Sequence, residues 1–191
     1  CAHDVKDWMS KMRLKMNDGK TEYMVIGTPQ QLAKCDLAPI TVGESTIAPT
    51  EVLRNLGAYF DQFMSMSHHI KIKCQAAYAQ LHHIAKIRKY LDQASAETLI
   101  HGLVHSHLDY SNALLAGRPK NLVRKLQMVQ TAAARVICRI SKYDHIQPTL
   151  KQLHWLPVAY RITFKLCVLT HKALHGTGPT YIRDMLHIRS T

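Results

Sequence analysis

The sequence predicts an α+β fold: a small antiparallel sheet with one helix, followed by a mostly α-helical bundle. Up to about Asp61, short apolar stretches alternate with turn residues, which is typical of strands. Beyond Asp61, apolar residues recur every three or four positions, which is typical of helices. Hydrophobic residues make up 47% of the 191 positions, enough to bury a sizeable core. We therefore expect two domains, at residues 1–63 and 64–191.

The first domain is predicted to hold one amphipathic helix and a few short strands. Residues 4–16 place Val, Trp and Met at helical spacing, with lysines on the other faces. Residues 21–27 predict the first strand, and residues 40–48 predict a hairpin that turns at 43–45. Residues 52–61 supply the next strand. Such a sheet is too small to bury both of its faces alone.

The second domain is predicted to be a helical bundle. Its apolar stripes mark long helices over residues 70–91, 99–114, 122–140 and 158–173. Pro157 suits the first position of the last helix, because a missing N–H and a fixed φ cost nothing there. The loops between these helices are short, so neighbouring helices are expected to pack antiparallel.

The chain is strongly basic, with 25 Lys and Arg against 13 Asp and Glu and a net charge of +12. A charge of this size suits a polyanionic partner, and nucleic acid is the usual one. The alternative is a fragment whose acidic residues lie in a missing part. The first residue is Cys rather than Met, so we expect the chain to be truncated at its N-terminus.

No apolar run approaches the roughly 20 residues of a membrane span, and the N-terminal residues lack the apolar centre of a signal peptide. We therefore expect an intracellular protein, in the nucleus or the cytoplasm or both, with no membrane partner. The five cysteines are odd in number and widely scattered, unlike a disulfide framework or a zinc site. They are predicted to be reduced and mostly buried.

Motifs for enzyme chemistry are weak in this sequence. His101 and His105 have the spacing of a metalloprotease zinc site, but Gly102 stands where that motif needs its catalytic Glu. A phosphate-binding loop, a dinucleotide fingerprint and a Ser-His-acid arrangement are all missing from the sequence. No metal site is therefore predicted in this chain.

Basic residues are more informative, because they gather near two predicted helix ends. Lys86, Arg88 and Lys89 lie at the end of one helix. A cation at the start of a helix gains no favourable interaction with the helix dipole, whose N-terminal end is positive. Four basic residues nevertheless lie near the start of the helix over 122–140. These are Arg118, Lys120, Arg124 and Lys125. A groove that tracks phosphates would explain this placement, and a solvated basic face is the alternative.

Short motifs follow one another along nearly the whole chain. They are WM (8–9), LKMN (14–17), GKTE (19–22), RNLGAYFD (54–61), IRKYL (87–91), LDYSN (108–112), QMVQTAAAR (127–135), KYDHI (142–146), LHWLPV (153–158) and KALHG (172–176). Each is weak alone. In this order they resemble the C-terminal part of the reverse transcriptase of non-LTR, LINE-type retrotransposons.

This resemblance implies a fragment of an RNA-directed DNA polymerase. Residues 4–26 resemble the end of the palm, residues 52–61 are similar to the primer-grip hairpin, and the helices from Ser65 onward resemble the thumb and its extension. The implied partner is an RNA–DNA or RNA template–primer, held by its phosphates along a basic helical face. A missing N-terminal palm and fingers portion would complete the enzyme.

The resemblance also implies roles for single residues. Lys20 matches the lysine that follows the catalytic strand and would assist the departing pyrophosphate, whereas a surface lysine in a turn is the alternative. Asn55, Leu56 and Gly57 would approach the primer, and packing of palm against thumb is their alternative role. The Mg²⁺ ions of the intact polymerase are held by palm aspartates expected before Cys1. This chain alone is therefore predicted to hold no cofactor and to be inactive as a polymerase.

Two other hypotheses come from different classes. A helical protein-interaction module would use the apolar stripes around Tyr110 and Trp155 as its partner surface. A decayed element would instead leave a non-functional product. The salt dependence of binding distinguishes the protein-interaction module from a nucleic-acid-binding protein. An apolar interface tolerates salt concentrations that abolish phosphate contacts.

Overall fold

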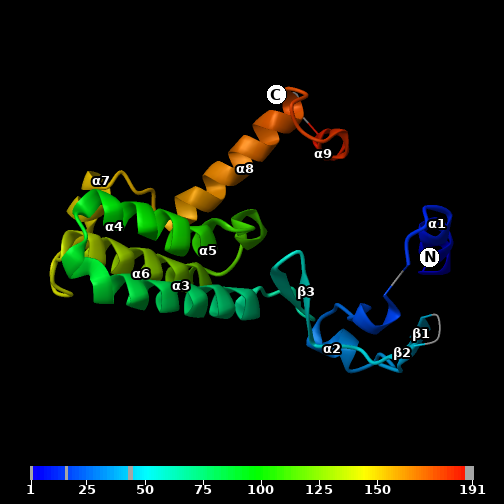
Figure 1. Cartoon of the computed structure of the whole chain (residues 1–191). Coiled ribbons are helices and arrows are strands. Elements are labelled where there is room, and N and C mark those ends of the chain that lie inside the picture. Colours follow the sequence, from blue (N-terminus) through cyan, green and yellow to red (C-terminus); the bar gives the residue numbers. More distant parts are fainter. Residues whose placement is uncertain (1, 16, 43–44, 188–191) are drawn as a thin grey trace. The chain divides into compact units, whose positions relative to one another are not determined.

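The computed structural model describes residues 2–15, 17–42 and 45–187. The fold is α+β, as the sequence predicts, with two separate antiparallel sheets of two strands each and a large helical part (Figure 1). Contacts group the chain into two compact units, Cys1–His69 and Ile70–Thr191, which we call the N-terminal unit and the helical unit. The domain boundary expected between residues 63 and 64 stays a prediction.

The N-terminal unit consists of short elements joined by turns. In chain order these are α1 (Ala2–Lys11), a 3₁₀ turn (Asp18–Lys20), α2 (Pro29–Leu32), β1 (Ile40–Val42), β2 (Ser45–Ile47), β3 (Val52–Asn55) and β4 (Ala58–Asp61). β1 and β2 pair from Ile40 opposite Ile47 to Val42 opposite Ser45. In the turn predicted between them, residues 43 and 44 lie outside the described part of the chain.

Two strand predictions in this unit are wrong in detail. Residues 52–61 form the two-stranded hairpin β3–β4, with Val52 opposite Asp61, instead of the one strand predicted from the pattern; the resemblance had implied a hairpin here. Residues 21–27 form no described strand, and Tyr23 makes only an isolated bridge to Pro49. The carbonyl of Tyr23 accepts a hydrogen bond from the N–H of Thr50 at 2.9 Å. Because Pro49 has no N–H, it cannot extend this contact into a ladder.

Asp61 shapes the passage from β4 into α3 (Ser67–Ile87). Its carboxylate accepts hydrogen bonds from the N–H groups of Phe63 at 3.2 Å, Ser65 at 2.9 Å and Met66 at 3.0 Å. Burial by itself raises the pKa of this carboxyl, but the hydrogen bonds outweigh it and hold the pKa below its usual value. One acidic residue thus ends the hairpin and organises the turn that leads into the helix.

The helical unit contains most of α3 and all later helices. These are α4 (Gln93–Ile100), α5 (Ser106–Asp109), α6 (Lys120–Cys138), α7 (Ile146–Gln152), α8 (Val158–Leu174) and α9 (Thr180–Asp184). One turn of π-helix, His101–His105, joins α4 to α5, and 3₁₀ turns occur at Arg88–Tyr90 and Asn112–Leu115. The predicted helix over 99–114 is therefore interrupted by a wider turn and ends in a 3₁₀ turn.

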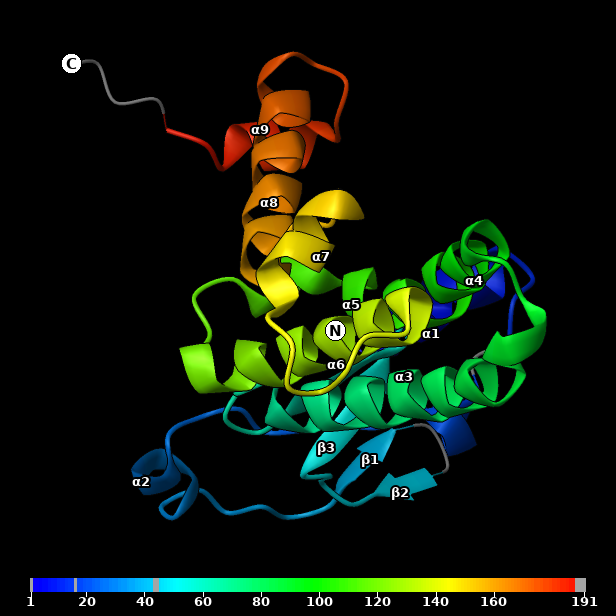
Figure 2. The same cartoon turned by 90° about the vertical axis from the view of Figure 1, so that its left-hand side faces the viewer.

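The core of the helical unit lies where α3, α4 and α6 run side by side (Figure 1). Ile84, Ile100, Leu126, Val129 and Ile137 are each no more than 2% exposed. The spacing of the sequence assigns Ile84, Leu126 and Val129 to the apolar stripes, whereas Ile100 and Ile137 are buried next to positions that it assigned. By contrast, α8 leaves this layer at a steep angle in both views, so antiparallel packing does not extend to it (Figure 1 and Figure 2).

The cysteines differ from the sequence-based expectation. All four described cysteines are free thiols: Cys35 and Cys167 are exposed, and Cys74 and Cys138 are half-buried. The prediction that cysteines are mostly buried is therefore wrong for the described part of the chain, and Cys1 lies outside it. Burial raises the pKa of the Cys74 and Cys138 thiols, which favours their neutral form.

Candidate nucleic-acid interface

The positive charge of the chain belongs to the helical unit. Residues 70–191 carry 18 Lys and Arg against 5 Asp and Glu, a net charge of +13. Residues 1–69 carry 7 basic against 8 acidic residues, a net charge of −1. The two values add to the +12 of the whole chain. Any electrostatic attraction for a polyanion therefore acts on the helical unit.

The start of α6 supplies one basic groove. Arg118, Lys120 and Arg124 line a groove of about 450 Å³ between α6 and α8, over a floor that includes Val123 and Ile162. Lys120 and Arg124 are one helical turn apart, so their side chains lie on the same face of α6. Within the described residues, the lining of this groove contains no Asp or Glu. The structure thus brings together three of the residues that the sequence analysis selected.

A second basic groove lies on the neighbouring face of α6, toward α3. Lys71 of α3 and Lys125 of α6 line this groove of about 500 Å³ together with Tyr78 and Met128. Tyr78 is 41% exposed, so an aromatic ring of the same lining is accessible. Basic side chains beside an accessible ring are a common arrangement in nucleic-acid sites. The sequence analysis selected Lys125 but missed Lys71, which becomes its neighbour only when α3 packs beside α6.

Arg88 lies differently from the phosphate contact that the sequence suggested. It is only 9% exposed, and its guanidinium donates hydrogen bonds to the carbonyls of Leu91 (2.6 Å), Val136 (3.1 Å) and Ile137 (2.6 Å). Two of these carbonyls belong to the last turn of α6, where helix carbonyls lack intrahelical partners and a cation is favourable. Arg88 therefore caps α6, and we remove it from the candidate interface.

The other two basic residues at the end of α3 are exposed. Lys86 is in the last turn of the helix, and Lys89 lies over the ring of Tyr90 at 4.8 Å from its centroid. Neither of them lines one of the two α6 grooves. Their contact with nucleic acid stays a prediction from sequence.

The hairpin tip in the N-terminal unit carries the three residues assigned to the primer. Asn55 ends β3, and Leu56 and Gly57 form the two-residue turn into β4. Both turn residues have positive φ, +47° at Leu56 and +80° at Gly57, as in a type I′ turn. Asn and Gly are favoured there, whereas Leu is strained by its Cβ. Leu56 is also 87% exposed, so a strained backbone presents an apolar side chain to solvent.

Replacing Leu56 with asparagine is expected to stabilise the hairpin by about 0.5–1 kcal/mol, because asparagine tolerates positive φ. Thermal unfolding of the full chain, followed by amide hydrogen exchange within β3 and β4, measures this gain. The same variant should weaken binding to a primer–template if the tip contacts it. A variant that gains stability with no loss of binding would indicate a turn without a binding role.

Lys20 is exposed and closes the 3₁₀ turn, where its N–H donates to the carbonyl of Asn17 at 3.1 Å. Lys20 thus lies on a turn, as the sequence analysis expects for either of its two roles. No group of three or more His, Cys, Asp or Glu suited to a metal ion occurs among residues 2–15, 17–42 and 45–187. The role of Lys20 stays a prediction from sequence.

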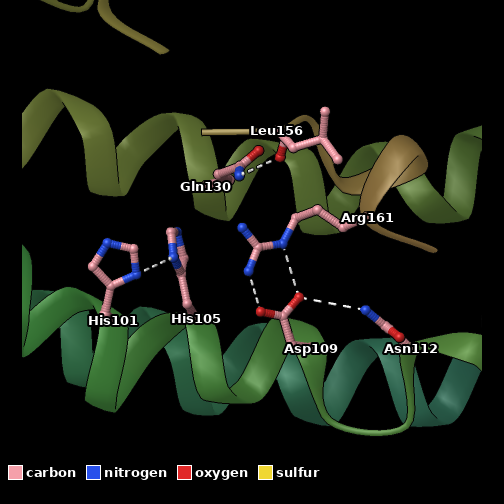
Figure 3. Close-up of polar contacts among 7 residues, drawn as sticks. All are labelled: His101, His105, Asp109, Asn112, Gln130, Leu156 and Arg161. Atoms are coloured by element: carbon pink, nitrogen blue, oxygen red, sulfur yellow. Dashed lines mark hydrogen bonds and ion pairs between the residues drawn. The ribbon is translucent and has the colours of Figure 1, made fainter. Parts of the chain in front are cut away.

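A buried polar network in the helical unit was missed by the sequence analysis (Figure 3). Arg161 of α8 binds the carboxylate of Asp109, with its Nε donating to Oδ1 at 2.8 Å. Gln130 is fully buried, and its side-chain amide donates to the carbonyl of Leu156 at 3.0 Å. The side-chain oxygen of Gln127 accepts from the N–H of Val158, the first residue of α8, at 2.9 Å. These contacts fix the start of α8 against α5 and α6, and so position one wall of the first groove.

The histidines of the metalloprotease-like spacing belong to the same region. His101 and His105 face each other in the π-helical turn, with their Nδ1 atoms 3.1 Å apart (Figure 3). The ring centroids of Trp155 and His105 are 4.2 Å apart. Burial lowers the pKa of His105 to about 3, with further contributions from the charges of Arg161 and His101. His105 is therefore neutral at pH 7 and is part of the core, whereas His101 is exposed.

Trp155 was also expected in a partner surface, and the structure corrects this. The side chain is only 5% exposed, beneath the chain that leads into α8. Tyr110 is 45% exposed, but the ammonium group of Lys73 lies over its ring at 4.4 Å. The Trp155 ring is therefore not available to a protein-interaction surface centred on these two residues.

Comparisons with known proteins gave no match for this chain among protein-family models, curated proteins or solved structures. The resemblance to non-LTR reverse transcriptases stays a prediction from the order of motifs in the sequence. Among the described helices, none is both long and apolar enough to cross a membrane.

Proposed function

We propose that this chain is the thumb-side part of a non-LTR reverse transcriptase and that its helical unit holds an RNA–DNA duplex by the phosphates. The observation that carries this proposal is the pair of basic grooves on α6, one lined by Arg118, Lys120 and Arg124 and the other by Lys71 and Lys125. Phosphate contacts of this kind are strong, salt-dependent and indifferent to base sequence.

Several features of the helical unit support this proposal over a solvated basic face. A solvated face requires only exposure, whereas these cations converge from two or three elements on grooves whose described linings contain no acid. The carboxylate of Asp109 is bound by Arg161 of α8 and so repels a phosphate less. Gathering like charges in this way destabilises the folded chain, because the charges repel one another. A bound polyanion offsets this repulsion.

In this proposal the chain contributes binding and the catalytic step belongs elsewhere. Polymerases of this kind hold two metal ions through palm aspartates, which activate the primer hydroxyl and stabilise the pyrophosphate. We assign those aspartates, and the Mg²⁺ they bind, to a palm and fingers portion that precedes the palm-like residues 4–26. Leu56 and Gly57 at the hairpin tip would then contact the primer end that the missing palm presents.

Neutralising three cations at the two grooves is expected to weaken binding to an RNA–DNA duplex at least tenfold at low salt. The variant is Lys120→Gln, Arg124→Gln, Lys125→Gln, and fluorescence anisotropy over a salt series measures the dissociation constant. Each lost phosphate contact should also reduce the salt dependence, by about 1 in the slope of log K against log salt.

The matched control removes the same charge from elsewhere in the helical unit. Lys142, Lys151 and Lys172 are exposed and line neither α6 groove, so their combined change to glutamine should weaken binding much less. Equal losses in the two triple variants would mean that net charge alone attracts the duplex. Absence of duplex binding by the unmodified chain at low salt would contradict the proposal itself.

A further inference from the structure

A third cavity of the helical unit has polar and aromatic walls and is separate from the two basic grooves. It has a volume of about 430 Å³, within the range of pockets that hold small ligands. Asn112, His154, Phe164 and Lys165 line it, together with the ion pair of Asp109 and Arg161. Figure 3 shows Asp109, Asn112 and Arg161 converging from the end of α5, the following turn and α8.

Asn112 is a lining residue of this cavity with an unsatisfied polar atom. The side chain is only 5% exposed, and its Nδ2 donates to Oδ1 of Asp109 at 3.4 Å. Its Oδ1 is buried and has no hydrogen-bond partner among the described residues. A buried acceptor without a donor is costly and therefore uncommon in folded proteins. Asp109 and Asn112 together form a polar wall of the cavity.

The opposite wall offers a flat apolar surface and a positive charge. Phe164 is 64% exposed although it lines the cavity, so its ring is accessible to a planar partner. Lys165 follows it and supplies an ammonium group at the same cavity. The backbone of His154 has a φ of +54°, and such strain in a non-glycine residue is often found at binding sites.

These groups match the chemistry of a nucleotide. Every nucleobase has a planar face for stacking and an N–H donor on its edge, and its phosphate is an anion. We propose that this cavity binds one unpaired nucleotide of the bound nucleic acid. The base stacks on Phe164, its edge lies against the polar wall of Asp109 and Asn112, and a neighbouring phosphate contacts Lys165. This site rests on the proposed function and extends it from the duplex to an adjoining single strand.

The test compares the affinity of the full chain for two nucleic-acid substrates. One is a blunt RNA–DNA duplex, and the other is the same duplex with a short single-stranded overhang. The overhang should tighten binding to the full chain about tenfold, because a base stacked on an aromatic side chain contributes this much or more. An overhang of abasic nucleotides keeps the phosphates but has no bases, and it should give little of this gain.

Two variants on the same helix complete the test. Phe164→Ala should abolish the gain from the overhang and leave blunt-duplex binding unchanged. Tyr160→Ala should keep the gain, since Tyr160 is also 64% exposed and lies one turn away but does not line the cavity. An abasic overhang that tightens binding equally, or equal losses in both variants, would overturn the site. Failure to bind even the blunt duplex would overturn the proposed function as well.

Discussion

Replacing Arg88 with alanine is expected to lower the free energy of unfolding of the helical unit by about 3 kcal/mol. The guanidinium donates to three backbone carbonyls, two of them in the last turn of α6, and hydrogen bonds from a charged group contribute about 1.5–3 kcal/mol each without being additive. Alanine would leave these carbonyls without a donor in a buried place. Urea unfolding monitored by circular dichroism measures the loss.

Two further variants make this prediction specific. Lys89→Ala removes the same charge from the next residue, which is exposed, and should change stability by less than about 0.5 kcal/mol. Arg88→Lys keeps the charge but loses the planar fork, so its stability should lie between wild type and alanine. If Arg88→Ala and Lys89→Ala cost the same small amount, the buried cap that we describe would be incorrect.

Acidification from pH 7 to pH 5 is expected to destabilise the helical unit by about 2 kcal/mol through His105. The pKa of His105 is lowered from 6.5 to about 3 in the folded chain, mainly by burial. Between these two values the unfolded chain binds a proton that the folded chain does not. Stability is therefore fully present above pH 6.5 and falls as the pH decreases toward 3. Chemical unfolding at a series of pH values measures this slope.

Replacement of the imidazole should remove most of this pH dependence. His105→Leu keeps a buried apolar body and cannot be protonated, so its stability should change little between pH 7 and pH 5 even if it is lower overall. His83→Gln is the control, because His83 is exposed and the slope should remain. Burial also lowers the pKa of His107, which adds a smaller slope of the same sign. An unchanged slope in His105→Leu would refute the buried, neutral state of His105.

The acid response of the N-terminal unit has a separate origin and a different pH range. Hydrogen bonds hold the pKa of Asp61 below its usual 3.8 despite burial. Its stabilising contribution is therefore present above pH 3.8 and is lost as the pH falls through the lower, folded pKa. The effect of His105 begins at higher pH, so the two units should respond to acid in different ranges.

Much of the fold could be predicted because it depends on local patterns. The predicted apolar stripe of α6 contains Leu126, Val129 and Ala133, and all three are buried as their spacing predicts. The start of α8 after Pro157 was predicted to within one residue, because proline acts on its own backbone. The strand pattern alone missed the turn within β3–β4, since a positive φ at a leucine has no sequence signal, although the resemblance implied a hairpin there.

The candidate interface was only partly predictable for a related reason. Sequence spacing placed Lys120 and Arg124 on one face of α6, since residues four apart on a helix are neighbours. It could not pair Lys125 with Lys71, because that requires α3 to lie beside α6. It also could not find the cavity at Asn112 and Phe164, whose residues come from separate elements of the helical unit.

The sequence by itself determined the α+β class, the long helices and the excess of positive charge, because periodicity and composition act within a few turns of chain. Only the tertiary structure decided which cations remain available to a ligand. Arg88 and Lys89 are adjacent in sequence, yet the first is buried against carbonyls 48 and 49 positions away while the second is exposed. The packing of α3 beside the end of α6 determines this difference, since it brings those carbonyls to Arg88 and leaves Lys89 in solvent.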